Sequence, residues 1–300
     1  MQINKQIASL IAGGFLAAAS SSVQAGVTAT SVLDMTNLVL EGSDGQPLDF
    51  IVDLNGQLTY TTTADGNVAL GADTDTNTGS IAPINLPVLC EGASCPQIAD
   101  DTFPVISGPP SADFATSDQY ESGAPITNVP DNSGGVFPTP ARVALASYVG
   151  IAAGNTSGSA NTNTNLNSSL NFTVAQAQGV TLKFDMRAYL EAFVSGADIF
   201  PSFATAGYTV EFKLTDLTTN TVVFEWKPDG TGANITGGTV NSEPFSLNST
   251  VSLNAPLPFD ITNTAGIHVP GSASIGSFSA TTNALEAGHL YQISARNVSN

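Results

Sequence analysis

Basic residues are scarce in this chain, which has 7 Lys and Arg against 25 Asp and Glu. Its formal net charge of −18 repels phosphate backbones and anionic lipid, and there is no basic stripe to bind them. We therefore expect no nucleic-acid partner and no binding to anionic membrane surfaces. We interpret the acidity as a source of solubility, and not as a site for a basic partner.

Long apolar runs are absent beyond the N-terminus. Residues 7–19 are mostly apolar and follow Lys5, but a bilayer span needs about 20 such residues. Small residues lead up to Ala25, as signal peptidase requires. We predict that residues 1–25 are a Sec signal peptide cut after Ala25; an uncleaved N-terminal anchor is the alternative.

Export by this route would take the chain through a periplasm or the cell surface to the outside, with no membrane span after signal removal. The mature chain would have 300 − 25 = 275 residues, and its charge would be 6 − 25 = −19 because only Lys5 is lost. That length can bury a substantial core in one domain.

Cysteine is limited to Cys90 and Cys95. In an oxidising compartment, two near cysteines most simply form a local disulfide. A metal site would need two more soft ligands, and the chain has only two histidines. A bridge over so small a loop would pin that loop and not the whole fold.

Apolar residues at helical spacing are scarce, and alternation with a period of two recurs instead. In residues 180–194 the even positions are apolar, while most odd positions, such as Lys183 and Arg187, are polar. Residues 208–214 and 222–226 alternate likewise around a turn, which predicts a hairpin. We predict that residues 26–300 form a single all-β domain, an antiparallel Greek-key or jelly-roll-like sandwich.

Leu285, Gly288 and Tyr291 have the spacing of a tyrosine corner. In such a corner the Tyr hydroxyl bonds back to the backbone where the chain crosses between the two sheets. An ordinary Gly turn before a strand is the alternative. In such a sandwich the next strand normally completes the sheet, but the sequence ends at Asn300. We therefore expect an earlier strand in that place, an open edge in the sheet, or a shortened sequence.

Two stretches do not look like strands. Residues 83–140 contain 10 of the 17 prolines and both cysteines, so we predict a long Pro-rich loop insertion over about residues 81–140. Residues 155–171 are mostly Asn, Ser and Thr. We interpret the first part of that stretch as an exposed loop before a strand around Leu170.

Catalytic constellations and cofactor motifs are absent from the sequence, so we expect no enzyme and no cofactor. Asp185 and Glu191 share the polar face of one predicted strand, where they read as solvated charges. Roughly 20 Å would separate them at strand spacing, which is too far for a glycosidase pair. A glycoside hydrolase built from acids that are distant in sequence is the last-ranked alternative.

Asp73, Asp75 and Asn77 place oxygen ligands at alternate positions, as calcium loops do. The following Gly79 is one position late for an EF-hand, and no Glu occupies the twelfth position. These residues are a weak calcium candidate, and an acidic turn between strands is the alternative.

Several short motifs resemble one known family. They are Asp-Met-Thr-Asn-Leu-Val-Leu at 34–40, the cysteine loop at 86–95, residues 114–126, the strand pair at 170–174 and 180–185, and residues 281–291. Together they are similar to the EDSAP family of bacterial PEP-CTERM proteins. The resemblance implies a surface or matrix protein of an exopolysaccharide-producing Gram-negative bacterium, and it carries over no catalytic residues.

Members of that family usually end in a sorting tail of Val-Pro-Glu-Pro, an apolar span and basic residues. The sequence ends at Asn300 without these features. We expect either a freely released member or a shortened sequence.

The expected function is that of a non-enzymatic structural or adhesive component of an exopolysaccharide or biofilm matrix. One alternative is a carbohydrate-binding module, although the single Trp226 is predicted to face the core. Another alternative is a subunit of a filament built by strand exchange. The expected partners are accordingly extracellular polysaccharide or further copies of the chain.

Overall fold

The computed structural model describes residues 26–46, 48, 60–70, 73–80, 83–92, 95, 98–131, 133–152, 160–195, 202–255, 263–266 and 272–300. The predicted signal peptide, residues 1–25, lies outside these residues. No helix in the described residues is long and apolar enough to cross a membrane.

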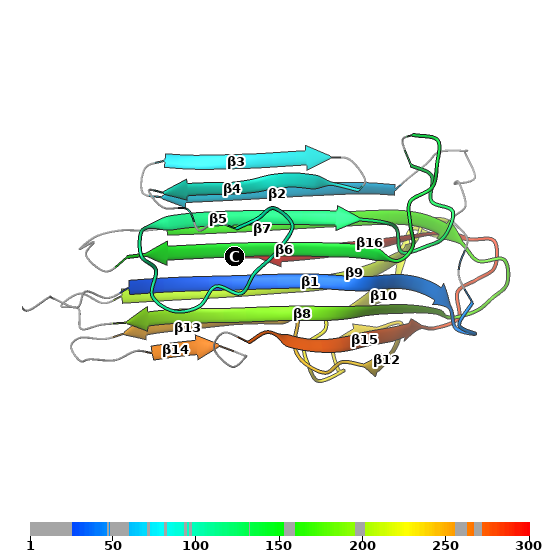
Figure 1. The fold of residues 1–300 in the computed structure, drawn as a ribbon. Helices are drawn as coiled ribbons and strands as arrows, with labels where there is room; N and C mark the ends of the chain where they lie inside the picture. The colour runs from blue at the N-terminus through cyan, green and yellow to red at the C-terminus, as the bar shows by residue number, and fades with distance from the viewer. Residues whose placement is uncertain are drawn as a thin grey trace, which may run out of the picture.

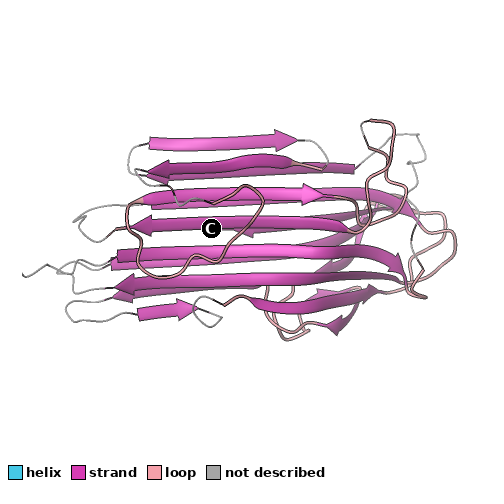
Figure 2. Cartoon of the chain, in the orientation of Figure 1, coloured by secondary structure: helices cyan, strands magenta, loops and turns pink. Residues whose placement is uncertain are grey.

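The described chain is all-β, as predicted, and folds into two large antiparallel sheets packed face to face (Figures 1 and 2). Sheet 1 runs in the order β12 (Gly238–Ser242), β15 (Ser274–Thr282), β8 (Val180–Ser195), β1 (Gly26–Gly42), β6 (Ala141–Ile151), β5 (Phe114–Ser122) and β4 (Asn85–Gly92), with β14 (Asn263–Gly266) also beside β8. Sheet 2 runs in the order β11 (Ile235–Thr236), β10 (Thr221–Trp226), β9 (Ser202–Asp216), β16 (Leu290–Ser299), β7 (Ala160–Thr173), β2 (Tyr60–Leu70) and β3 (Asp73–Ser80), with β13 (Asn248–Ala255) also beside β9.

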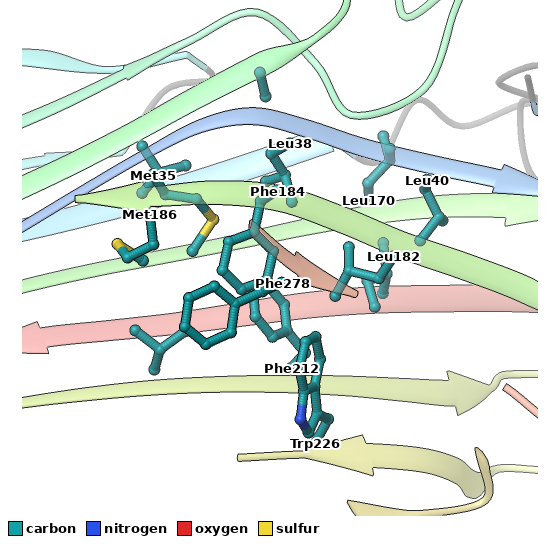
Figure 3. Packing of buried hydrophobic residues seen from close by; sticks show 14 of the residues in the cluster. Met35, Leu38, Leu40, Leu170, Leu182, Phe184, Met186, Phe212, Trp226 and Phe278 are labelled. Carbon is teal, nitrogen blue, oxygen red and sulfur yellow. The ribbon is translucent and has the colours of Figure 1, made fainter. Parts of the chain in front are cut away.

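The main core lies between the sheets and is aromatic at one end. The Phe184 ring of β8 lies 5.3 Å from the Phe212 ring of β9 and 5.1 Å from the Phe278 ring, centroid to centroid (Figure 3). Trp226 packs on Phe212 with its centroid 5.8 Å away, and its indole N–H donates to Glu243 at 2.8 Å. The predicted hairpin is confirmed, since β10 pairs with β9 around residues 217–220. Trp226 is fully buried, as the alternation predicted.

Residues 98–108, here called the strap, cross the outer face of sheet 1 (Figure 1). Phe103 is completely buried against Tyr148 and Tyr189 in a second, smaller core on that outer face. The hydroxyls of Thr28 and Thr30 in β1 donate to strap carbonyls at 2.7 and 2.8 Å. The strap therefore closes part of a face that the alternation pattern left to solvent.

Glu191 of β8 lies on the part of the outer face that the strap covers. The odd face of β8 was expected to be wet, but Glu191 is only 2% exposed, so the interpretation as a solvated charge is wrong. Its carboxylate accepts hydrogen bonds from the Ser107 hydroxyl of the strap at 2.9 and 3.0 Å and from the neighbouring Tyr189 hydroxyl. Asp185, on the same face beyond the strap, stays half-buried and accepts from Asn37 and Ser277.

The Pro-rich region is only partly loop. Residues 98–113, which include the strap, and residues 123–131 and 133–140 are loops, as expected, but the region also contributes β4 and β5 to sheet 1. Pro87 lies within β4, at the edge of the sheet, where a missing N–H costs no ladder bond. The region is thus part of the sandwich and does not stand apart from it.

The Asn-rich stretch is also more regular than its composition suggested. The expectation of a loop over its first part is wrong from residue 160 onward, because β7 begins at Ala160 and pairs with both β2 and β16. Its inward residues Thr162, Thr164 and Leu166 are buried, and its outward residues are asparagines. Residues 155–159 lie outside the described residues.

The chain crosses from β15 in sheet 1 to β16 in sheet 2 at residues 283–289. There the Tyr291 hydroxyl accepts the Glu286 N–H at 2.7 Å and donates to the Glu286 carbonyl at 3.2 Å. Leu285 is buried, and Gly288 has a φ of 76°, in the left-handed region that favours glycine. This is the geometry of a tyrosine corner.

β16 lies between β7 and β9 and pairs with both of them. Of the arrangements expected from the sequence, the structure therefore has the one in which earlier strands lie beside the last strand.

Replacing Tyr291 by Phe should lower the free energy of unfolding by about 1 kcal/mol, because it removes the hydroxyl that joins the two halves of the corner. Urea unfolding followed by circular dichroism would measure the change. Tyr120→Phe is the control, since within the described residues the Tyr120 ring contacts Arg142 and its hydroxyl has no hydrogen bond. Equal stability of the two variants would contradict the role of the corner.

Candidate functional site

The outer face of sheet 2 is a polar array open to solvent. Opposite residues of an antiparallel pair lie on the same face roughly 5 Å apart, so the strand register orders this face in rows. One row runs Thr63, Asn167, Arg296, Glu211, and the next runs Thr61, Ser169, Ser294, Lys213. All of these side chains are exposed or half-buried.

A shallow groove of about 330 Å³ lies over these two rows. It is lined by hydroxyl, amide and charged side chains from β2, β7, β16 and β9. Hydroxyls and amides both donate and accept hydrogen bonds, so such a lining suits a ligand that is itself rich in hydroxyls. The groove exists because β16 inserts between β7 and β9.

The basic residues of the described chain divide into two groups. Arg142 and Arg187 pair with Asp34, and Lys183 pairs with Glu41. Lys227 contacts Glu225 at 3.0 Å and Glu211 at 3.3 Å.

Lys213 and Arg296 form the second group. Within the described residues neither has an ion pair, and both line the groove. They lie diagonally across the β9–β16 pair, since Ser294 is opposite Lys213 and Arg296 is opposite Glu211. Diagonal neighbours are about 7–8 Å apart, so both cations can reach one anionic group or two successive ones.

A second cluster lies where the strap meets β5. Carboxylate oxygens of Asp100, Asp101 and Asp118 lie within 4.8 Å of one another. Asp118 is 1% exposed, and its burial, followed by the charge of Asp100, raises the pKa of its carboxyl to about 7. Such oxygens are ligands that Ca²⁺ prefers. Asp101 Oδ1 is buried without a hydrogen-bond partner, but Asp101 as a whole is half-buried, and we assign the cluster no function.

The calcium residues predicted from the sequence lie elsewhere. Asp73, Asp75 and Asn77 are in β3, paired with Leu70, Val68 and Gly66, so the interpretation as a turn is wrong. Alternate residues on a strand are roughly 7 Å apart, and their backbone does not wrap around an ion as a calcium loop does. The sequence does not reveal the cluster of Asp100, Asp101 and Asp118, because the strap and β5 are separate segments that only the fold brings together.

Cys90 of β4 and Cys95 form a disulfide, as predicted. The bridge joins the end of β4 to the segment that leads into the strap.

Inside the sandwich, Glu121 is 3% exposed and accepts hydrogen bonds from three hydroxyls. Thr62 and Ser168 donate to one carboxylate oxygen at 2.8 and 2.7 Å, and Tyr60 donates to the other. Burial raises the pKa of the Glu121 carboxyl, although the three hydrogen bonds lower it in part. Burial and the nearby Glu121 also raise the pKa of the Tyr60 hydroxyl. This network lies between the sheets and links β5 of sheet 1 to β2 and β7 of sheet 2.

Comparisons with protein-family models, with curated proteins and with solved structures give no match for this chain.

The raised pKa of Glu121 predicts a stability that depends on pH. The native state holds this proton to higher pH than the unfolded chain does. The resulting stability is fully present below the ordinary pKa of 4.5 and is lost as pH rises through the folded-state pKa.

Glu121→Gln removes this titration, so its stability relative to the parent should increase as pH rises above 4.5. The gain should be about 1.4 kcal/mol for each pH unit over which only the native state holds the proton. Urea unfolding at several pH values would measure it, with surface Glu225→Gln as the control. The pKa of Asp118, raised to about 7, adds a slope of the same sign that persists in both variants. A parallel pH profile for parent and Glu121→Gln would contradict the prediction.

Proposed function

We propose that this chain is a non-enzymatic extracellular protein that binds acidic polysaccharide along the outer face of sheet 2, as a structural or adhesive component of a matrix. The observation that carries this proposal is that Lys213 and Arg296, which have no ion pair among the described residues, share a groove otherwise lined mainly by hydroxyl and amide side chains. Uronic-acid sugars have the matching groups, with a carboxylate for the cations and hydroxyls for the Thr, Ser and Asn side chains.

The charge distribution favours a sugar polymer over other anions. The formal net charge of −18 opposes a densely charged partner such as a nucleic acid. A uronate polysaccharide has a single carboxylate on each sugar beside several neutral hydroxyls, so most of its contacts can be neutral, which suits an array with only a few ionic residues. The resemblance to the EDSAP family supports a surface or matrix setting.

Strand exchange is supported less well. β16 is hydrogen-bonded on both sides, so it offers no edge to a strand from another copy. A glycoside hydrolase would need two acids facing the groove, and Glu211 is the one acid in its lining, held by Lys227 at 3.3 Å.

The double substitution Lys213→Ala with Arg296→Ala should weaken binding to polygalacturonate about tenfold or more, because it removes both cations that can pair with uronate carboxylates. Isothermal titration calorimetry would measure the affinity, and added salt should weaken binding by the parent protein. Lys183→Ala, a lysine on the opposite sheet, is the matched control. An unchanged affinity in the double variant, or no binding of any acidic polysaccharide by the parent, would overturn the proposal.

A further inference from the structure

Phe203 is an aromatic side chain on the same outer face of sheet 2. It belongs to β9 and is 63% exposed, and within the described residues it is the one aromatic among the exposed large hydrophobic side chains. Its neighbour Ala204 points into the sandwich and is buried. Since strand side chains alternate between faces, Phe203, Thr205, Glu211 and Lys213 all point to the side that carries the groove.

Within the described residues, the surroundings of Phe203 are neutral and rich in hydroxyls. Thr205, two residues along β9, shares a hydrogen bond of 3.1 Å with Ser252 of the neighbouring β13. Thr250 is exposed in the next row, opposite Gly207. No outward residue of β9 from Phe203 to Thr209, and none of β13 from Asn248 to Ser252, is charged. A sugar ring matches this pattern, because it has an apolar face that can lie on an aromatic ring and a rim of hydroxyls.

The distance between Phe203 and the groove restricts the type of ligand. Glu211, which lies opposite Arg296 at the groove, is eight residues from Phe203 along the same strand, or roughly 27 Å. A monosaccharide or disaccharide cannot touch both places, whereas an extended chain lying along β9 can.

We infer that Phe203 is a stacking platform for a sugar ring of the same polysaccharide chain whose carboxylates are bound in the groove. This inference rests on the proposed function and adds that the polysaccharide chain lies along β9. The platform and the groove act as two linked contacts on one ligand, so the second contact adds affinity only when the ligand is long enough to reach it.

The test compares polygalacturonate with its disaccharide by isothermal titration calorimetry, on the full chain and its variants. Phe203→Ala should weaken polymer binding about fivefold to tenfold and leave disaccharide binding unchanged. Phe203→Tyr should keep the parent affinity, because the ring remains. Ile275→Ala is the matched control, since Ile275 is 77% exposed and lies on the opposite sheet beside Arg187. Since Phe203 is largely exposed, the melting temperature of Phe203→Ala should match that of the parent.

Two results would overturn the inference while leaving the proposed function intact. One is a Phe203→Ala variant that binds polymer as tightly as the parent, while the Lys213→Ala/Arg296→Ala variant loses binding. The other is an equal loss for polymer and disaccharide, which would place Phe203 within a short site. A parent protein that binds neither ligand would overturn the proposed function itself.

Discussion

The contact between the Phe184 and Phe212 rings, 5.3 Å apart, joins the inner faces of β8 and β9, and much of the structure depends on it. Phe278 stacks on Phe184. Because strand side chains alternate, Glu211 and Lys213 must point to the outer face of sheet 2 when Phe212 points into the core between the sheets. A shift of one residue in register would bury those charges. The groove is therefore a consequence of how the aromatic core packs.

The other end of the sandwich is held by polar contacts. The hydroxyl of Thr164 in β7 lies 2.6 Å from that of Ser117 and 3.0 Å from that of Ser147, both from sheet 1. Glu121 completes this polar interior with its three hydroxyl donors. Small side chains release little free energy on burial, but each buried hydroxyl needs a partner, so these bonds select one alignment of the sheets. This packing supports the long Thr- and Asn-rich strands β2 and β7, which make up part of the outer face of sheet 2 that carries the groove.

Strands with large apolar residues on one face can be predicted from the sequence, whereas strands with polar residues on both faces cannot. β8 and the β9–β10 hairpin were predictable because large apolar residues such as Phe184 and Trp226 alternate with polar ones. The sequence predicts a loop for part of β7 because its inward residues, such as Thr162 and Thr164, are as polar as its outward asparagines. Period-2 alternation is invisible when both faces have the same polarity. The sequence predicts a solvated Glu191 because no local pattern shows that residues 98–108 fold across it.

The sequence by itself determined the all-β class, the alternation of the aromatic strands, the local disulfide and the spacing of Leu285, Gly288 and Tyr291. These properties depend on residues that are close along the chain. The tertiary structure alone decided which outer face is covered by the strap. It also decided that Lys213 of β9 and Arg296 of β16 share one groove, and that Asp100 and Asp101 meet Asp118. Those outcomes depend on the order of strands in each sheet, which is set by long-range packing and is not contained in any local pattern.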